Sequence, residues 1–188
     1  MRKRNILPDY AGTFRTYSGK IMNVLDPAPE MIDLTDISKG LSYNAHFTGQ
    51  TPQFFSIAEH CLLTEYLVRK QYPEDYQLRL IALLHDAAEA YIGDMIHPIK
   101  LLFPEFKAME NKLLAVIFET FNLPIDRLPE VKPFDLQAQD MEASEFYDQP
   151  GNWPGKGIYY HSPESVYRLF KNSVAEHLRI YNSKPIND

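Results

Sequence analysis

The sequence has few of the features that would tie it to an oxidising compartment or a membrane. Cys61 is the single cysteine among 188 residues, which excludes an intrachain disulfide and a thiolate-rich zinc site. The longest apolar runs, such as 81–84 and 113–118, fall far short of the ~20 residues of a membrane span. The basic N-terminus lacks an apolar signal core before Pro8. We therefore expect a cytoplasmic protein without a membrane anchor.

Positive charge is also scarce. The chain has 19 Lys and Arg against 25 Asp and Glu, for a net charge of −6, which opposes binding to a nucleic-acid polymer. A small phosphorylated ligand stays compatible, because a bound metal can dominate the local field. Hydrophobic residues make up 45% and charged residues 23%, values that predict a packed core. We expect residues 1–188 to form one domain with its core at about 33–182.

Helical patterns dominate after residue 50, where strand signals are scarce. The N-terminal 32 residues are rich in turn formers, and "TYSGK" at 16–20 predicts a hairpin tip. A short helix is expected from about 33 or 35 to 41. Ser56 followed by Glu59 has capping-box spacing and predicts a helix to about 71.

Further helices are expected at about 74–90, 104–121, 133–147 and 163–181, and the last three have Pro near their start. Pro98 predicts a turn, and "DQPGNWPGKG" at 148–157 predicts a loop. The expected fold class is all-α: one helical domain with a less regular N-terminal arm that contains a small hairpin.

The stretch "IALLHDAAEAYIGD" at 81–94 places ionisable residues on an apolar helix face. His85 and Glu89 continue the face that begins with Leu78 and Ile81, at i, i+3 and i+4 spacings, and Asp86 lies beside them. An unpaired charge on such a face costs several kcal/mol, so a partner should compensate these residues. Imidazole nitrogen and carboxylate oxygen are ligands suited to Zn, Mn, Fe or Co.

His60 is a further candidate ligand. It lies on the preceding predicted helix, on a face shared with Ile57, Cys61 and Thr64. A hydrogen-bonded core histidine is the alternative interpretation. Two half-buried histidines on consecutive helices, with Asp86 beside one of them, favour a metal site.

Three motifs carry a family resemblance: "SIAEH" at 56–60, "LLHDAAEAYIGD" at 83–94 and "VKPFD" at 131–135. They resemble the HD-domain metal-dependent phosphohydrolases, in the branch of bacterial 5′-deoxynucleotidases and phage-type dATP triphosphohydrolases. The resemblance covers most of the chain. It implies an HD-type helical bundle that hydrolyses phosphate ester or anhydride bonds in nucleotides, and a homo-oligomer whose substrate is a small molecule.

The resemblance also implies the ligands of a divalent metal, which would be Zn, Mn, Co, Fe or Mg. Carried over by position, these ligands are His60, His85, Asp86 and Asp135. From the residues alone Asp140, on the same predicted helix, is equally able to bind a metal. The "VKxxD" spacing, with a glutamate seven residues further on, favours Asp135.

Two catalytic residues follow from the same resemblance. Glu89 matches the HDxxE position and would orient or deprotonate the attacking water, and Asp94 matches an acidic residue that contacts substrate. Lys100 and Lys132 match positions that approach the phosphates, although both could be surface lysines. His46, before a phenylalanine, stands where relatives tend to have a phosphate-binding arginine; it could replace that arginine or be a loop histidine without a role.

Two other functions compete with phosphohydrolysis. A di-iron oxygenase of the HD type would need more His ligands between the HD pair and the last Asp, and His97 is the one histidine in that interval. A catalytically silent nucleotide-binding protein would not need the water-activating carboxylate of Glu89. The sequence therefore favours a metal-dependent phosphohydrolase.

Overall fold

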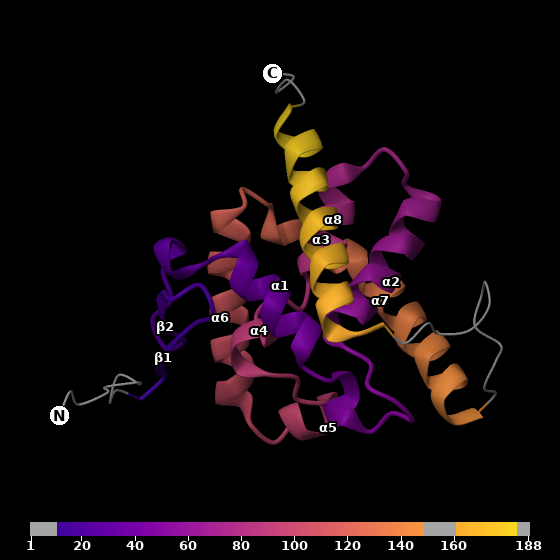
Figure 1. Ribbon diagram of the computed structural model, residues 1–188, viewed down its shortest axis with the longest axis horizontal. Helices are drawn as coiled ribbons and strands as arrows, with labels where there is room; N and C mark the ends of the chain where they lie inside the picture. Colours follow the sequence, from indigo (N-terminus) through magenta and orange to yellow (C-terminus); the bar gives the residue numbers. More distant parts are fainter. Residues whose placement is uncertain (1–10, 149–160, 184–188) are drawn as a thin grey trace.

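Helices make up most of the structure, and a small β-hairpin precedes them (Figure 1). The computed structural model describes residues 11–148 and 161–183. The hairpin consists of β1 (Thr13–Arg15) and β2 (Ile21–Asn23). The α-helices are α1 (Leu34–Tyr43), α2 (Ile57–Gln71), α3 (Tyr76–Leu84), α4 (Glu89–Ile92), α5 (His97–Lys100), α6 (Pro104–Thr120), α7 (Leu128–Ala143) and α8 (Pro163–Ser183). Three short 3₁₀ helices in the described residues are η1 (Pro29–Met31), η2 (His46–Gly49) and η3 (Ile125–Arg127), and η4 (Ser144–Asp148) is a short π-helix. The predicted fold class, a helical domain with an N-terminal hairpin, is confirmed.

The hairpin is tied to the first helix through a buried carboxylate. β1 and β2 pair antiparallel, with Phe14 opposite Met22. Asp36 of α1 accepts hydrogen bonds from the backbone N–H of Ser18, at 2.6 Å, and from its hydroxyl, at 2.7 Å. Both donors lie in the turn between the strands, at the predicted "TYSGK" tip.

The core surrounds α3. Every residue from Leu78 to Leu84 is buried, so this helix is enclosed on all sides and is not amphipathic. Helices α2, α7 and α8 pack against it, and α1 packs against α8 and α4; Figure 1 shows α8 lying along α1 and α3. The helices α2, α3 and α7 therefore meet at the centre of the domain, where the candidate site lies.

The start of α2 has the predicted capping box. The hydroxyl of Ser56 accepts from the Glu59 N–H, and the Glu59 carboxylate accepts from the Ser56 N–H at 2.8 Å. These reciprocal bonds satisfy donors at the helix N-terminus. They also fix the first turn of α2, which carries His60.

The single helix predicted at 74–90 is wrong, because the α-helical hydrogen-bond pattern stops after Leu84 although the backbone angles of His85 stay α-helical. The α3 helix ends at Leu84, and α4 begins at Glu89. Between them the N–H groups of Ala87 and Glu89 bond to carbonyls three residues back, as in a 3₁₀ turn. Apolar periodicity continues through this segment, so it could not reveal the break. The turn carries His85, whose ring lies against His60 of α2 and Asp135 of α7.

Other boundaries also differ from prediction. The helix expected from residue 133 begins at Leu128, so Pro133 lies inside it, while Pro129 occupies its first turn. The turn expected at Pro98 is the one-turn helix α5. The loop predicted at 148–157 lies outside the described residues except for its first position. The domain limits of 1–188 stay a prediction.

None of the helices that the structure describes is long and apolar enough to cross a membrane.

Gly40 permits the close contact between α1 and α4. A Cβ at this position would lie 2.3 Å from the carbonyl oxygen of Ala90 and 2.7 Å from its Cα. Gly40→Ala must therefore move backbone, and we expect it to lower the free energy of unfolding by about 1–3 kcal/mol. Urea unfolding of parent and variant measures this loss, and equal midpoints and slopes would contradict the close approach.

Candidate metal centre

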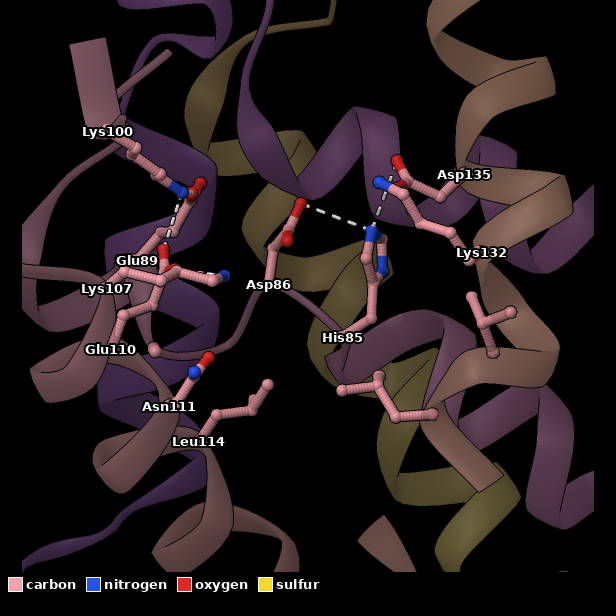
Figure 2. Close-up of a pocket in the computed structure, with 13 residues that line it drawn as sticks. His85, Asp86, Glu89, Lys100, Lys107, Glu110, Asn111, Leu114, Lys132 and Asp135 are labelled. Atoms are coloured by element: carbon pink, nitrogen blue, oxygen red, sulfur yellow. Dashed lines mark hydrogen bonds and ion pairs between the residues drawn. The ribbon is translucent and has the colours of Figure 1, made fainter. Parts of the chain in front are cut away.

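Four side chains from three parts of the chain converge at the centre of the domain. His60 comes from α2, His85 and Asp86 from the turn after α3, and Asp135 from α7. The Nε2 of His60 lies 3.1 Å from Oδ1 of Asp135 and 3.3 Å from Nε2 of His85. The Nε2 of His85 lies 3.2 Å from Oδ2 of Asp86. Figure 2 shows the Asp86 and Asp135 carboxylates on opposite sides of the His85 ring.

The second nitrogen of each imidazole already has a partner. The Nδ1 of His85 donates to the carbonyl of Ala82 at 2.8 Å, and the Nδ1 of His60 donates to Oε1 of Glu142 at 2.9 Å. A neutral imidazole carries one N–H, so both Nε2 atoms present lone pairs. With both imidazoles neutral, two lone pairs and two carboxylates face one another, and a proton or a bound metal ion can satisfy such a set of acceptors.

Electrostatics in the cluster favour positive charge. Burial works to lower the pKa of His60, but the charge of Glu142 and the hydrogen bond to Asp135 outweigh it and raise that pKa well above its usual value. Burial is likewise outweighed at His85, whose pKa is raised chiefly by Asp86. The histidines in turn hold the pKa of Asp135 well below its usual range, against the effect of burial. The cluster thus stabilises added positive charge, whether a proton on an imidazole or a bound ion.

The donor atoms fit a divalent metal ion. One ligand atom from each of His60, His85 and Asp135 lies within 4.8 Å of the others. Mixed imidazole and carboxylate sets suit Zn, Mn, Fe or Co. The buried Cys61 sulfur, to which the sequence assigned no role, also lies within 4.8 Å of ligand atoms of His85 and Asp86.

His46 lies against this cluster. Its ring stacks on the ring of His60 with centroids 4.6 Å apart. Its two nitrogens lie 3.4 Å from Oδ2 of Asp94 and 3.4 Å from Oε2 of Glu142, without hydrogen-bond geometry. The next residue, Phe47, has a φ of 52°, a left-handed conformation that is unusual for a bulky side chain and typical of functional sites. His46 and Asp94, each predicted separately as a site residue, therefore lie beside the cluster and close to each other.

Glu89 is a buried carboxylate beside the candidate metal centre, with 4% of its surface exposed. Burial, reinforced by the charge of Asp86 and opposed by that of Lys100, raises the pKa of Glu89 to about 8. Its Oε1 accepts a hydrogen bond from Lys100 at 2.8 Å. A carboxyl group with a pKa near neutral is suited to accept and return a proton.

The two predicted phosphate-binding lysines make carboxylate contacts. Lys100 lies between Glu89 and Glu110, with its Nζ 2.6 Å from Oε1 of Glu110. Lys132 donates to Oδ2 of Asp135 at 2.6 Å, and its side chain is largely exposed. Both line the cavities described next, as does Lys107.

Two other residues considered in the sequence lie apart from the cluster. Asp140 is exposed on α7, so the structure brings Asp135, and not Asp140, to the two histidines. His97, the residue on which a di-iron interpretation would depend, is exposed at the edge of the larger cavity.

Two cavities of about 250 and 730 Å³ open beside the candidate metal centre. The six residues that line both are Asp86, Glu89, Lys100, Lys107, Lys132 and Asp135. The cavities are therefore two parts of one cleft, which we call the lysine cleft. The larger part falls within the range of small-molecule sites, roughly 300–1,000 Å³.

Comparison with known proteins places the chain in a family. It is 36% identical over 141 residues to the uncharacterized protein YfdR of Escherichia coli K12, a match that covers 74% of this chain and 76% of YfdR. The chain belongs to the YfdR family. An uncharacterized protein of Rhodobacter capsulatus is 40% identical over 114 residues, and that match spans 58% of each chain, less than two thirds of the relative's length. No family model matches.

The names of both relatives state no activity. Membership of the YfdR family therefore gives no substrate.

Sequence reasoning gave no role to three acidic or basic residues of the site. Glu142 orients His60 and lies seven residues after Asp135, two turns along the same face of α7. In the sequence this i, i+7 spacing favoured Asp135 as a ligand, but Glu142 itself was assigned no role. Glu110 and Lys107 join the site through α6, and their contacts with Lys100 depend on tertiary packing that no local pattern reports.

Proposed function

We propose that this chain is a metal-dependent phosphohydrolase of the HD-domain type, acting on deoxynucleotides. The observation that carries the proposal is the pair of imidazole Nε2 atoms facing two carboxylates beside an open cleft. His60, His85, Asp86 and Asp135 would hold the ion. Four protein ligands leave coordination positions open, as catalytic metal sites require.

When bound, a divalent ion would supply Lewis acidity beside Glu89. The chain's own groups provide the remaining parts of the reaction. Glu89 accepts a proton from the attacking water, whose oxygen forms a bond to phosphorus as the bond to the leaving oxygen breaks. The ammonium groups of Lys100 and Lys132 lie where they can neutralise phosphate oxygens. The proton held by Glu89 is then available to the leaving group.

The substrate is proposed to be a small nucleotide and not a nucleic-acid polymer. The cleft volume of about 730 Å³ suits a small molecule, and the net charge of −6 disfavours a polyanion. Both mono- and triphosphates fit the proposal. Assembly of the chain as a homo-oligomer, expected from the resemblance, also stays a proposal.

A nucleotide panel tests this function. Phosphate release and nucleoside formation should be measured across deoxy- and ribonucleoside mono-, di- and triphosphates with Zn, Mn, Co, Fe or Mg. We expect turnover of at least one deoxynucleotide that stops when the metal is removed with a chelator and returns when metal is restored. Turnover that persists in fully metal-free protein, or its absence with every nucleotide and metal, would contradict the proposal.

A further inference from the structure

Glu110 is a buried carboxylate of α6 with 5% of its surface exposed, and it faces the lysine cleft. Its two oxygens accept hydrogen bonds from different lysines, each at 2.6 Å: Oε1 from Lys100 and Oε2 from Lys107. Figure 2 shows the Lys100 ammonium between the carboxylates of Glu89 and Glu110. The four side chains form a row of alternating charge, Glu89–Lys100–Glu110–Lys107.

Lys100 lies on α5, a helix of a single turn, so its own element does little to hold its side chain. A lysine also has four rotatable side-chain bonds, and fixing them costs conformational entropy. The two short contacts, 2.8 Å to Glu89 and 2.6 Å to Glu110, define one position for its ammonium group. Glu110 comes from the longer α6 and supplies the contact that does not involve the proposed base.

We propose that Glu110 is a positioning residue, which shares the ammonium group of Lys100 with the proposed base Glu89 and keeps the positive charge of Lys100 from acting on Glu89 alone. This inference rests on the proposed function of Glu89. Glu110 is not itself catalytic, because its contacts are with lysines. Without the charge of Glu110, Glu89 alone balances the charge of Lys100, and this weakens Glu89 as a proton acceptor.

Kinetics of Glu110→Gln test the proposal. We expect kcat to fall by about 10- to 100-fold, the cost of a small misplacement of catalytic groups, while KM changes little. The matched control is Glu119→Gln, the same substitution at an exposed position of α6, which should behave as the parent.

A double-variant cycle shows whether Glu110 acts through Lys100. In a Lys100→Met background the further change Glu110→Gln should cost little, because residues that act as a unit are not additive. An undiminished loss in that background would overturn the inference, as would parent kinetics in Glu110→Gln alone.

A second measurement keeps this inference separable from the proposed function. Hydrogen exchange of the Lys100 ammonium, followed by ¹⁵N NMR on metal-free protein, needs no substrate. We expect slow exchange in the parent and faster exchange in Glu110→Gln, since a neutral amide oxygen accepts a weaker hydrogen bond from the ammonium group than a carboxylate does. Equal exchange rates in parent and variant would overturn the role of Glu110 even if nucleotides are hydrolysed. Unequal rates together with a failed nucleotide panel would instead overturn the proposed function, and with it the positioning of a catalytic base.

Discussion

Asp135→Asn is expected to weaken metal binding by at least ~100-fold, more than is usual for the loss of a group outside the ligand shell. The amide keeps the size of the side chain but removes its negative charge. Asp135 contacts His60 at 3.1 Å and also accepts hydrogen bonds from Lys132 and Gln139. The variant therefore loses a ligand and leaves the donors of those two residues poorly matched.

The matched control is Asp140→Asn, on the same helix and with the same chemical change, because Asp140 is exposed. Calorimetric titration with Zn or Mn and elemental analysis of the purified proteins measure the difference. We expect Asp140→Asn to bind metal as the parent does. The reverse order of affinities would show that the wrong carboxylate had been assigned to the metal.

Local patterns predicted the parts of the fold that local physics determines. The capping box at Ser56 is an arrangement of neighbouring residues, and it fixed the start of α2. The hairpin tip at 16–20 is also a local feature. The break after Leu84 was not predicted, because apolar periodicity runs through it. The helix start at Leu128 was not predicted, because proline is typical of a first helical turn and Pro133 lies inside this helix.

The residues of the candidate site can also be divided into those that sequence motifs identify and those whose contacts depend on tertiary packing. The four predicted ligands lie in the short motifs that carry the family resemblance, so they could be named from the sequence. The structure brings these four side chains together. The role of Glu110 depends on how α5 and α6 pack, and no spacing along the chain encodes that contact. The position of Lys100 between two carboxylates could not be predicted for the same reason.

Glu89→Gln is expected to lower kcat by at least ~100-fold while metal content and nucleotide affinity stay near those of the parent. Glutamine keeps the shape of the side chain, and its oxygen can still accept the hydrogen bond that Lys100 donates to Oε1. It cannot take a proton from water. A ligand role for Glu89 would instead predict loss of metal.

The same substitution has a signature in stability. Burial raises the pKa of Glu89 to about 8, above its value in an unfolded chain, so the folded state disfavours the ionised carboxylate. The destabilisation begins as pH rises past the unfolded pKa and is complete above about 8. Glutamine does not ionise, so metal-free Glu89→Gln should melt at a higher temperature than metal-free parent above that pH.

Three measurements decide the role of Glu89: elemental analysis for metal, calorimetry for nucleotide binding, and single-turnover kinetics for the chemical step. Glu119→Gln, an exposed glutamate of α6, controls for the loss of one negative charge. Retained metal and affinity with a slow chemical step identify a base or a water-orienting group, because such a group acts in the transition state more than in the bound state. A variant that binds nucleotide and turns it over at the parent rate would rule out this mechanism.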